Sequence, residues 1–139
     1  MQFEDKEGTV WPMRVDWAAI RRSRAANCDL CDELILEQII RGGSVLIDAL
    51  WAVLEPIAGQ AKIAQTVFES RIRGEVWDQA RDALMEGLED FFPPQKVEIL
   101  KAIQKEFRET VETNLKKSAE AYSDLPEKSE GSDQQTSTA

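Results

Sequence analysis

The chain has 139 residues, no histidine, two cysteines and a net charge of −9. At this length we expect one domain, because a second one would be too small to be stable alone. Histidine is the usual general base near neutral pH and the commonest metal ligand, so its absence disfavours catalytic triads and His-containing metal sites. The negative charge disfavours nucleic acid as a partner, since phosphate binding requires clustered Lys and Arg. We therefore expect neither a hydrolase nor a metalloenzyme, and we expect no cofactor.

The beginning of the chain and its longest apolar run argue against secretion and against a membrane helix. Residues 1–8 lack the basic flank and the apolar stretch of a signal peptide, and the best apolar run, 42–54, is broken by Asp48. A membrane helix needs about 20 apolar residues. We expect a soluble, intracellular protein with reduced cysteines and no membrane partner.

The first expected element is a β-hairpin. Phe3 and Trp11 flank the turn-forming stretch Asp5-Lys6-Glu7-Gly8, whose glycine can adopt the positive φ that a tight turn requires. Residues 2–13 are therefore predicted to form two short antiparallel strands.

Five or six helices are expected after the hairpin, placed by capping residues, glycines and prolines. The candidate segments are approximately residues 17–26, 30–41, 44–56, 66–73, 75–92 and 94–122. Asp16, Asp29 and Ser44 are the predicted N-caps of the first three helices, because their side-chain oxygens can accept hydrogen bonds from the first turn. The glycine pair at 42–43 is predicted to end the second helix, and Pro56 the third. The pattern predicts a mainly α fold.

The third of these helices is apolar almost all round, so we expect it to run through the centre of the domain. Asp48 lies within it, between Ile47 and Ala49. A buried carboxylate is costly unless it is paired. The sequence therefore predicts a structural ion pair between Asp48 and Arg21 or Arg24 in preference to a catalytic role.

A sharp corner is predicted between the fifth and sixth helices. Pro93 and Pro94 cannot continue a helix, but they suit the first turn of another one. Phe91 and Phe92 are expected to lock the corner, with at least one ring buried against Trp77 or the third helix. Most of the four tryptophans are expected in the core, although aromatic side chains also serve as anchors in interfaces.

The sixth helix is predicted to be long, on the order of 40 Å, and its last three turns are expected to project. Its apolar residues recur at helical period: Val97, Leu100, Ile103, Phe107, Val111, Leu115, Ala119 and Tyr122. The candidate residues for binding another protein are those on the last turns: Val111, Leu115, Ala119 and Tyr122. Packing of this stripe against its own domain is the alternative.

Residues 1–122 are thus expected to form one helical domain that includes the hairpin. The following residues, 123–139, contain one large apolar side chain, which cannot offset the entropy lost on ordering the segment. They are predicted to form a disordered acidic tail.

Cys28 and Cys31 form a CxxC motif, which is the spacing of redox pairs and of half a zinc site. A redox site of this kind lies between a strand and a helix in an α/β unit, which the predicted helices do not provide. A zinc site would need two further Cys or His ligands, and the chain has none. We interpret the two cysteines as small apolar residues buried at the start of a helix.

Two clusters of charged residues lie near this motif. The acidic cluster is Asp29, Asp32, Glu33 and Glu37, and the basic cluster is Arg14, Arg21, Arg22 and Arg24. The acidic cluster lacks the spacing of a calcium-binding loop, so we interpret it as a solvated helix face. The basic cluster could belong to a helix-turn-helix, but the next helix would then be the recognition helix, and its acidic side chains have the wrong sign for DNA.

The order of several short motifs resembles one protein family. They are Asp-Lys-Glu-Gly-x-x-Trp-Pro-x-x-Val, an Arg-Arg pair, Asp-Leu, Gly-Gly, Ile-Asp-Ala-Leu-Trp-Ala-Val-Leu-Glu-Pro, Phe-Glu-x-x-Ile-x-Gly-Glu and Ala-Leu-x-x-Gly-Leu-x-x-Phe-Phe-Pro-Pro. The series resembles the tail assembly chaperone-like proteins of long-tailed phages and prophages over residues 3 to about 105. The cysteine pair and the long polar tail depart from that family.

The resemblance implies a non-enzymatic helical protein in the cytoplasm of an infected or lysogenic bacterium. Such a protein binds the tape-measure protein, helps the tail-tube protein to assemble, and then leaves. Self-association is a further expected contact, because proteins of this kind coat an extended helical client through repeated weak contacts. Two alternatives stay open: a structural tail-completion or connector protein that is retained in the particle, and a small acidic regulator associated with DNA.

Overall fold

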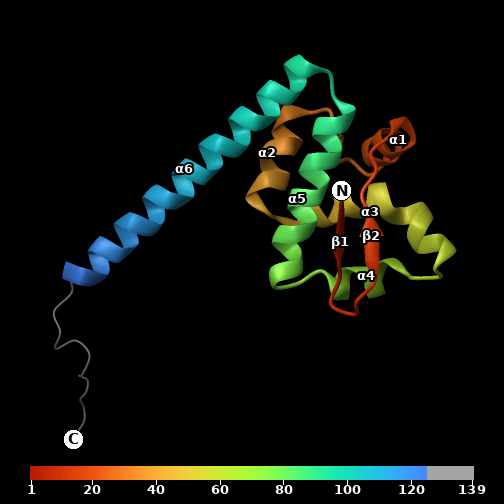
Figure 1. Ribbon diagram of the computed structural model, residues 1–139, viewed down its shortest axis with the longest axis horizontal. Helices are drawn as coiled ribbons and strands as arrows, with labels where there is room; N and C mark the ends of the chain where they lie inside the picture. The colour runs from red at the N-terminus through yellow and green to blue at the C-terminus, as the bar shows by residue number, and fades with distance from the viewer. Residues whose placement is uncertain (125–139) are drawn as a thin grey trace, which may run out of the picture. The chain divides into compact units, whose positions relative to one another are not determined.

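The computed structural model describes residues 1–124, with side chains described as far as Lys117. This part of the chain forms a two-stranded hairpin followed by six helices (Figure 1). The elements are β1 (Gln2–Glu4), β2 (Val10–Pro12), α1 (Trp17–Ala25), α2 (Glu33–Arg41), α3 (Ser44–Gln60), α4 (Gln65–Arg71), α5 (Glu75–Phe91) and α6 (Pro94–Asp124). The predicted mainly α fold with an N-terminal hairpin and a long final helix is confirmed.

The hairpin pairs β1 with β2 in antiparallel fashion, with Phe3 opposite Trp11. Both aromatic side chains are buried, whereas the strand residues on either side of them are exposed. This alternation is expected for a sheet with one face on the core. Gly8 adopts a φ of +84° in the turn, and its amide donates to the carbonyl of Asp5. The predicted hairpin and the role of its glycine are thus confirmed.

Local capping residues set the ends of α1 and α2, and one of these residues differs from the prediction. Asp16 caps α1 as predicted, because its carboxylate accepts a hydrogen bond from the first turn. The predicted cap of the second helix is wrong, since α2 begins later and its N-cap is Asp32. Asp29 instead closes the preceding turn by accepting from the amide of Cys31. Gly42 ends α2 in the left-handed conformation, with φ +79°, as the glycine pair predicts.

Both predicted ends of the third helix are wrong. Ser44 is the first residue of α3, not its cap, and Gly43 occupies the cap position without a side-chain hydrogen bond. The helix also continues through Pro56 and ends at Gln60. A proline inside a helix removes the N–H that would bond the carbonyl four residues earlier, which here is that of Ala52.

Arg22 on α1 supplies the missing donor. Its Nε donates to the carbonyl oxygen of Ala52 at 2.6 Å, and its Nη2 donates to that of Val53 at 3.3 Å. The guanidinium therefore pairs the carbonyl that Pro56 leaves without an N–H. The same two hydrogen bonds link α1 to α3.

α3 is the central helix, in agreement with its apolar sequence. It contacts α1, α2, α4 and α5, and α5 also packs along β1 (Figure 1). The ring of Trp11 on β2 meets that of Phe68 on α4 edge to face, with centroids 5.1 Å apart. This contact brings the hairpin beside α4.

The corner between α5 and α6 is built from aromatic rings. Phe92 is buried, and half-buried Phe91 packs edge to face on Trp17 with a centroid distance of 5.1 Å. The predicted burial of at least one ring is confirmed. The ring that meets Phe91 is nevertheless Trp17, whereas Trp77 lies against Gly42. Trp17 itself stays 59% exposed.

The chain divides into two units, residues 1–104 and the residues from 105 on. In the first unit, Leu100 on α6 is fully buried, and the side chain of Gln104 donates to the Glu89 carboxylate on α5 at 3.2 Å. In the second unit, α6 continues to Asp124. The expected projection of the last turns stays a prediction. The predicted tail lies, from residue 125 onward, outside the described residues.

No helix within residues 1–124 is long and apolar enough by itself to cross a bilayer. α2 and α3 together reach the required length and composition, but they are bent by 109° at the break between them. Four large apolar side chains of α3 are buried inside the first unit: Leu46, Leu50, Val53 and Leu54.

Candidate functional site

The predicted protein-binding stripe lies on the second unit. Leu115 is 65% exposed, and Val111 is half-buried. Ala119 and Tyr122 belong to the same helix, but their side chains lie beyond the described ones. Phe107, one turn before Val111, is also half-buried. The described part of the stripe thus presents apolar side chains at intervals of four residues along one helix.

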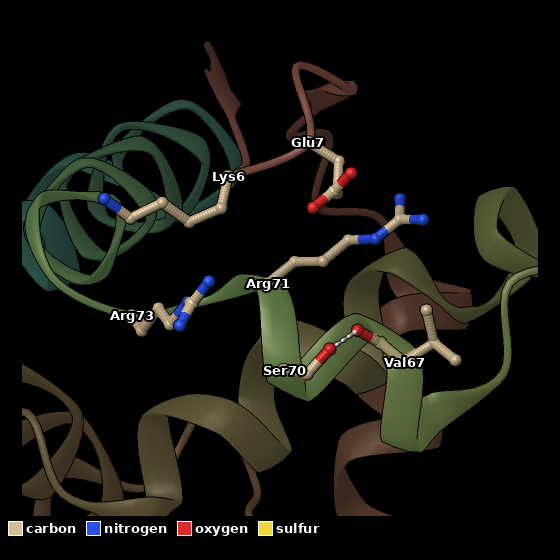
Figure 2. A pocket seen from close by; sticks show the side chains of 6 residues that line it. All are labelled: Lys6, Glu7, Val67, Ser70, Arg71 and Arg73. Atoms are coloured by element: carbon tan, nitrogen blue, oxygen red, sulfur yellow. Dashed lines mark hydrogen bonds between the residues drawn. The ribbon is translucent and has the colours of Figure 1, made fainter.

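The first unit contains a pocket that the sequence did not indicate, at the turn of the hairpin. It is a hollow of about 320 Å³ between that turn and the end of α4 (Figure 2). Its lining residues are Lys6, Glu7, Val67, Ser70, Arg71 and Arg73. Three of these six side chains are cationic and one is anionic, so the lining carries a net positive charge on an acidic protein.

The backbone of the hairpin turn forms one wall of this pocket. The amide of Lys6 donates to the carbonyl oxygen of Arg71 at 3.4 Å, which ties the turn to the last residue of α4. Gly74, just before α5, has a φ of +62°, and Lys6 Nζ lies 3.4 Å from the position that a Cβ would occupy there. A side chain at residue 74 would be strained by this positive φ, and Lys6 lies directly beside the position.

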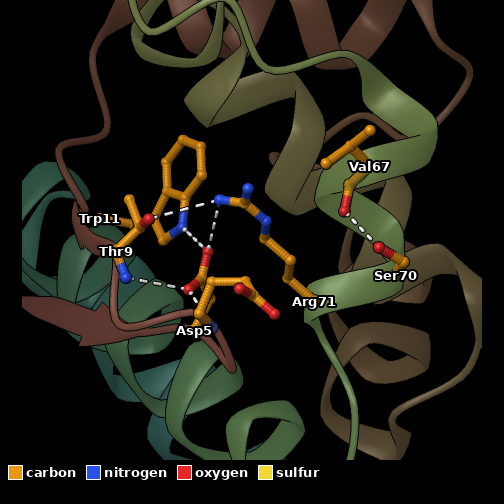
Figure 3. Close-up of polar contacts among 7 residues, drawn as sticks. Asp5, Thr9, Trp11, Val67, Ser70 and Arg71 are labelled. Atoms are coloured by element: carbon orange, nitrogen blue, oxygen red, sulfur yellow. Dashed lines mark hydrogen bonds and ion pairs between the residues drawn. The ribbon is translucent and has the colours of Figure 1, made fainter.

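Asp5 anchors the same turn from inside (Figure 3). Its carboxylate accepts hydrogen bonds from Trp11 Nε1 at 2.9 Å and from the amides of Glu7 and Thr9 at 2.9 and 3.0 Å. Arg71 Nη1 lies 3.4 Å from the same carboxylate and also donates to the hydroxyl of Thr9. The Asp5 side chain is fully buried, and Arg71 is only 21% exposed.

These contacts set the charge state of Asp5. Burial works against its ionisation, but the hydrogen bonds from Trp11, Thr9 and Glu7 and the charge of Arg71 outweigh it, so the pKa of Asp5 lies below its ordinary value. A buried ionised carboxylate with this many donors holds its partners in place. Arg71 therefore enters the pocket as a fixed group.

Lys6 and Arg73 differ from Arg71 in having exposed side chains. Among the described residues, Arg71 alone of the three cations makes an ion pair within 4.0 Å. In Figure 2, Lys6 and Arg73 lie on one side of the hollow, and Glu7 lies on the other side with the guanidinium of Arg71. The arrangement can bind an anionic group with two adaptable cations beside a fixed one.

A second hollow, of about 470 Å³, lies beside the start of α3, and Asp48 is one of its lining residues. This residue is exposed and lines the hollow together with Trp77 and Glu69, so the expected burial and pairing of Asp48 are wrong. The two proposed partners lie elsewhere: Arg21 is exposed on α1, and Arg24 pairs with Asp29 at 3.3 Å. Helix α3 buries its other faces and leaves the face with Asp48 outward.

The two cysteines are not bonded to each other. Cys28 is buried and Cys31 is half-buried, and both are free thiols. Burial, and then the charges of Asp48 and Asp29, raise the pKa of Cys28 to about 11, so this thiol is protonated at neutral pH. A protonated thiol is a poor nucleophile and a poor metal ligand. Within residues 1–117, no group of three His, Cys, Asp or Glu side chains could hold a metal ion.

Three side chains of the acidic cluster near the cysteines bind groups that are close to them in the sequence. Asp32 caps α2, and Asp29 pairs with Arg24. Glu37 pairs with Arg41 one turn later, at 3.6 Å. These contacts agree with the interpretation of a solvated face.

Comparisons with protein-family models, with curated proteins and with solved structures find no match to this chain. The features of this chain that bear on its function are the order of motifs in its sequence, the apolar stripe on α6 and the pocket at the hairpin turn.

Proposed function

We propose that this chain is a tail assembly chaperone of a long-tailed phage or prophage. It would bind the tape-measure protein and assist assembly of the tail tube through protein contacts, without catalysis. The order of motifs over residues 3 to about 105 supports the family, and the mainly helical fold with its hairpin is compatible with it.

One observation carries the proposed mode of binding, which is the apolar stripe on α6. Leu115 is largely exposed, and Phe107 and Val111 precede it at intervals of four residues. Residues four apart stand on one face of a helix. A narrow apolar stripe of this kind suits packing against a second helix, and an extended helical client offers such a surface along its length.

The free energy of association expected from the stripe suits a chaperone that later dissociates from its client. Full burial of a Val or Leu side chain stabilises an association by about 1.5–3 kcal/mol. A few such residues per copy give a weak contact, and many copies along one client give strong total binding that can be reversed copy by copy. Ala119 and Tyr122 continue the stripe in the sequence, four residues after Leu115 and three residues after Ala119.

The test is co-expression with the tape-measure product of the same genome. The measured quantities are the soluble yield of that product and its recovery with the tagged chain. The parent chain is compared with a variant that carries Val111→Ala and Leu115→Ala. We expect the parent to keep the tape-measure product soluble and bound, and the variant to lose most of this binding while its thermal unfolding stays unchanged.

The matched control replaces two residues on the opposite face of the same helix, Glu109→Ala and Thr113→Ala. Both side chains are exposed, and alanine preserves the helix. Binding that persists in this control but not in the stripe variant assigns the contact to the stripe. A parent chain that neither binds nor solubilises the tape-measure product would overturn the chaperone proposal itself.

A further inference from the structure

The charge of the first unit is unevenly distributed. The outward face of α5 carries five exposed carboxylates, Glu75, Asp78, Asp82, Glu86 and Asp90. The pocket at the hairpin turn has the opposite character, because Lys6, Arg71 and Arg73 line it. A basic pocket on a protein of net charge −9 is a local feature that its composition does not require.

The three cations are arranged for binding an oxyanion. Arg71 is fixed by Asp5 and Thr9, so little side-chain entropy remains to be lost when a ligand binds next to it. Lys6 and Arg73 are exposed and stand on the same side of the hollow (Figure 2). Gly74, the N-cap residue of α5, lies directly beside Lys6 and supplies no side-chain cap. The N-terminus of α5 therefore adds a partial positive charge near Lys6.

We propose that this pocket binds side-chain carboxylates of an acidic segment of the client protein, with Lys6 and Arg73 as the pairing residues. The proposal rests on the proposed function, because it names the chemistry by which the client is recognised. It adds a second, charged contact on the first unit to the apolar contact on α6.

Two features of the pocket favour a polypeptide over a phosphate group. Glu7 lines the hollow opposite Lys6 and Arg73, so a compact dianion at its centre would be repelled. Carboxylates spaced along a chain can approach the two cations and avoid Glu7. Val67 is 43% exposed at the rim and can contact the methylene groups of Glu side chains.

The experiment uses the full chain, labelled with ¹⁵N, and a capped hexaglutamate peptide as the probe. Backbone amide shifts are followed during titration at low salt, and again at 0.3 M salt. We expect saturable shifts that centre on residues 6–8 and 71–74, and weaker binding at high salt because exposed ion pairs are screened. Inorganic phosphate, titrated to the same total charge, should bind more weakly at these residues.

Two variants assign the binding. Lys6→Glu with Arg73→Glu should weaken binding of the peptide by about tenfold or more, since two attractive contacts become repulsive. The milder pair Lys6→Gln with Arg73→Gln serves if charge reversal lowers the thermal unfolding temperature. The control is Lys62→Glu with Lys101→Glu, two exposed lysines outside the pocket lining, which changes the net charge equally.

Equal weakening in the control and in the pocket variants would overturn the proposal, because the binding would then follow net charge alone. Shifts that never saturate, or that lie outside the pocket, would do the same. If phosphate binds as tightly as the peptide, the ligand of the pocket is a small anion, and the proposed acidic segment is wrong. None of these results affects binding of the tape-measure product through α6, which is measured separately.

Discussion

Asp5 determines how the hairpin turn is held. It is the fully buried carboxylate of the first unit, and its four donors come from the turn, from β2 and from α4. Trp11 Nε1 is buried with it and has this carboxylate as its acceptor. The stability of the hairpin and the shape of the basic pocket therefore depend on one ionised side chain.

Asp5→Asn should lower the free energy of unfolding by about 1–3 kcal/mol near pH 7. An amide nitrogen would face Trp11 Nε1 and Arg71, so a buried donor is left without an acceptor. The measurement is urea unfolding followed by tryptophan fluorescence. The control is Glu4→Gln, which removes an exposed carboxylate from the neighbouring strand and should change the free energy by less than about 0.5 kcal/mol.

Because the pKa of Asp5 is lowered in the folded chain, we expect the free energy of unfolding to depend on pH. This pKa is lower in the folded chain than the value of about 3.9 in an unfolded one. A lowered pKa stabilises the fold above the unfolded value, and this contribution disappears as the pH falls through the folded pKa. The difference in stability between parent and Asp5→Asn should therefore be constant from about pH 5 to pH 7 and shrink below about pH 4. A difference that is the same at pH 3 and pH 7 would contradict the assignment.

The cysteines give a prediction about reactivity. At pH 7.5 a thiol reagent such as iodoacetamide should modify Cys31 well before Cys28, because Cys28 is buried and burial raises its pKa to about 11. Mass spectrometry of the digested protein measures both rates. Replacement of both residues by Ala should leave a folded, metal-free protein. Stoichiometric zinc in the parent, lost in the double variant, would show that the cysteines hold a metal after all.

Helix α3 continues through Pro56 to Gln60, although the sequence predicts that it ends at the proline. A proline normally ends a helix, and the sequence offers no local reason for this one to continue. The reason is tertiary, since Arg22 from α1 pairs the carbonyl of Ala52 that Pro56 leaves open. The same interaction explains why an arginine of the basic cluster is partly buried in a protein that we do not expect to bind DNA.

A double-mutant cycle tests this interaction. Arg22→Ala should cost about 1–3 kcal/mol in the parent, because the carbonyl of Ala52 loses its donor. With Pro56→Ala in place, the helix supplies its own N–H, and the cost of Arg22→Ala should become markedly smaller. Arg21→Ala, on the exposed side of α1, is the matched control. An equal cost of Arg22→Ala in both backgrounds would refute the link to Pro56.

The elements that could be predicted are those with local signals. Gly8 and Gly42 require positive φ, Asp16 caps a helix, and a proline pair starts α6, so the hairpin and most helix ends follow from neighbouring residues. Asp48 shows the limit of such reasoning. Asp48 is the charged residue in an apolar stretch of α3, and the sequence does not show which face of this helix is exposed. That face is determined by the four helices that pack around α3.

The two candidate contacts of the molecule differ in how far the sequence reveals them. The apolar stripe on α6 has helical spacing, so the sequence alone predicts it. The basic pocket depends on the meeting of Lys6 with Arg71 and Arg73, which are far apart in the chain. The turn and the end of α4 each carry basic residues, but only folding brings them together.

A chaperone of the proposed kind assists assembly and then leaves the particle. Quantitative mass spectrometry of infected or induced cells and of purified particles, with the tail-tube protein as the internal standard, measures whether it does so. We expect the chain to be abundant in the cell lysate, where it is recovered with the tape-measure protein, and to be missing from mature particles. A fixed number of copies in every purified particle would rule out a chaperone that leaves and would identify a connector or tail-completion protein instead.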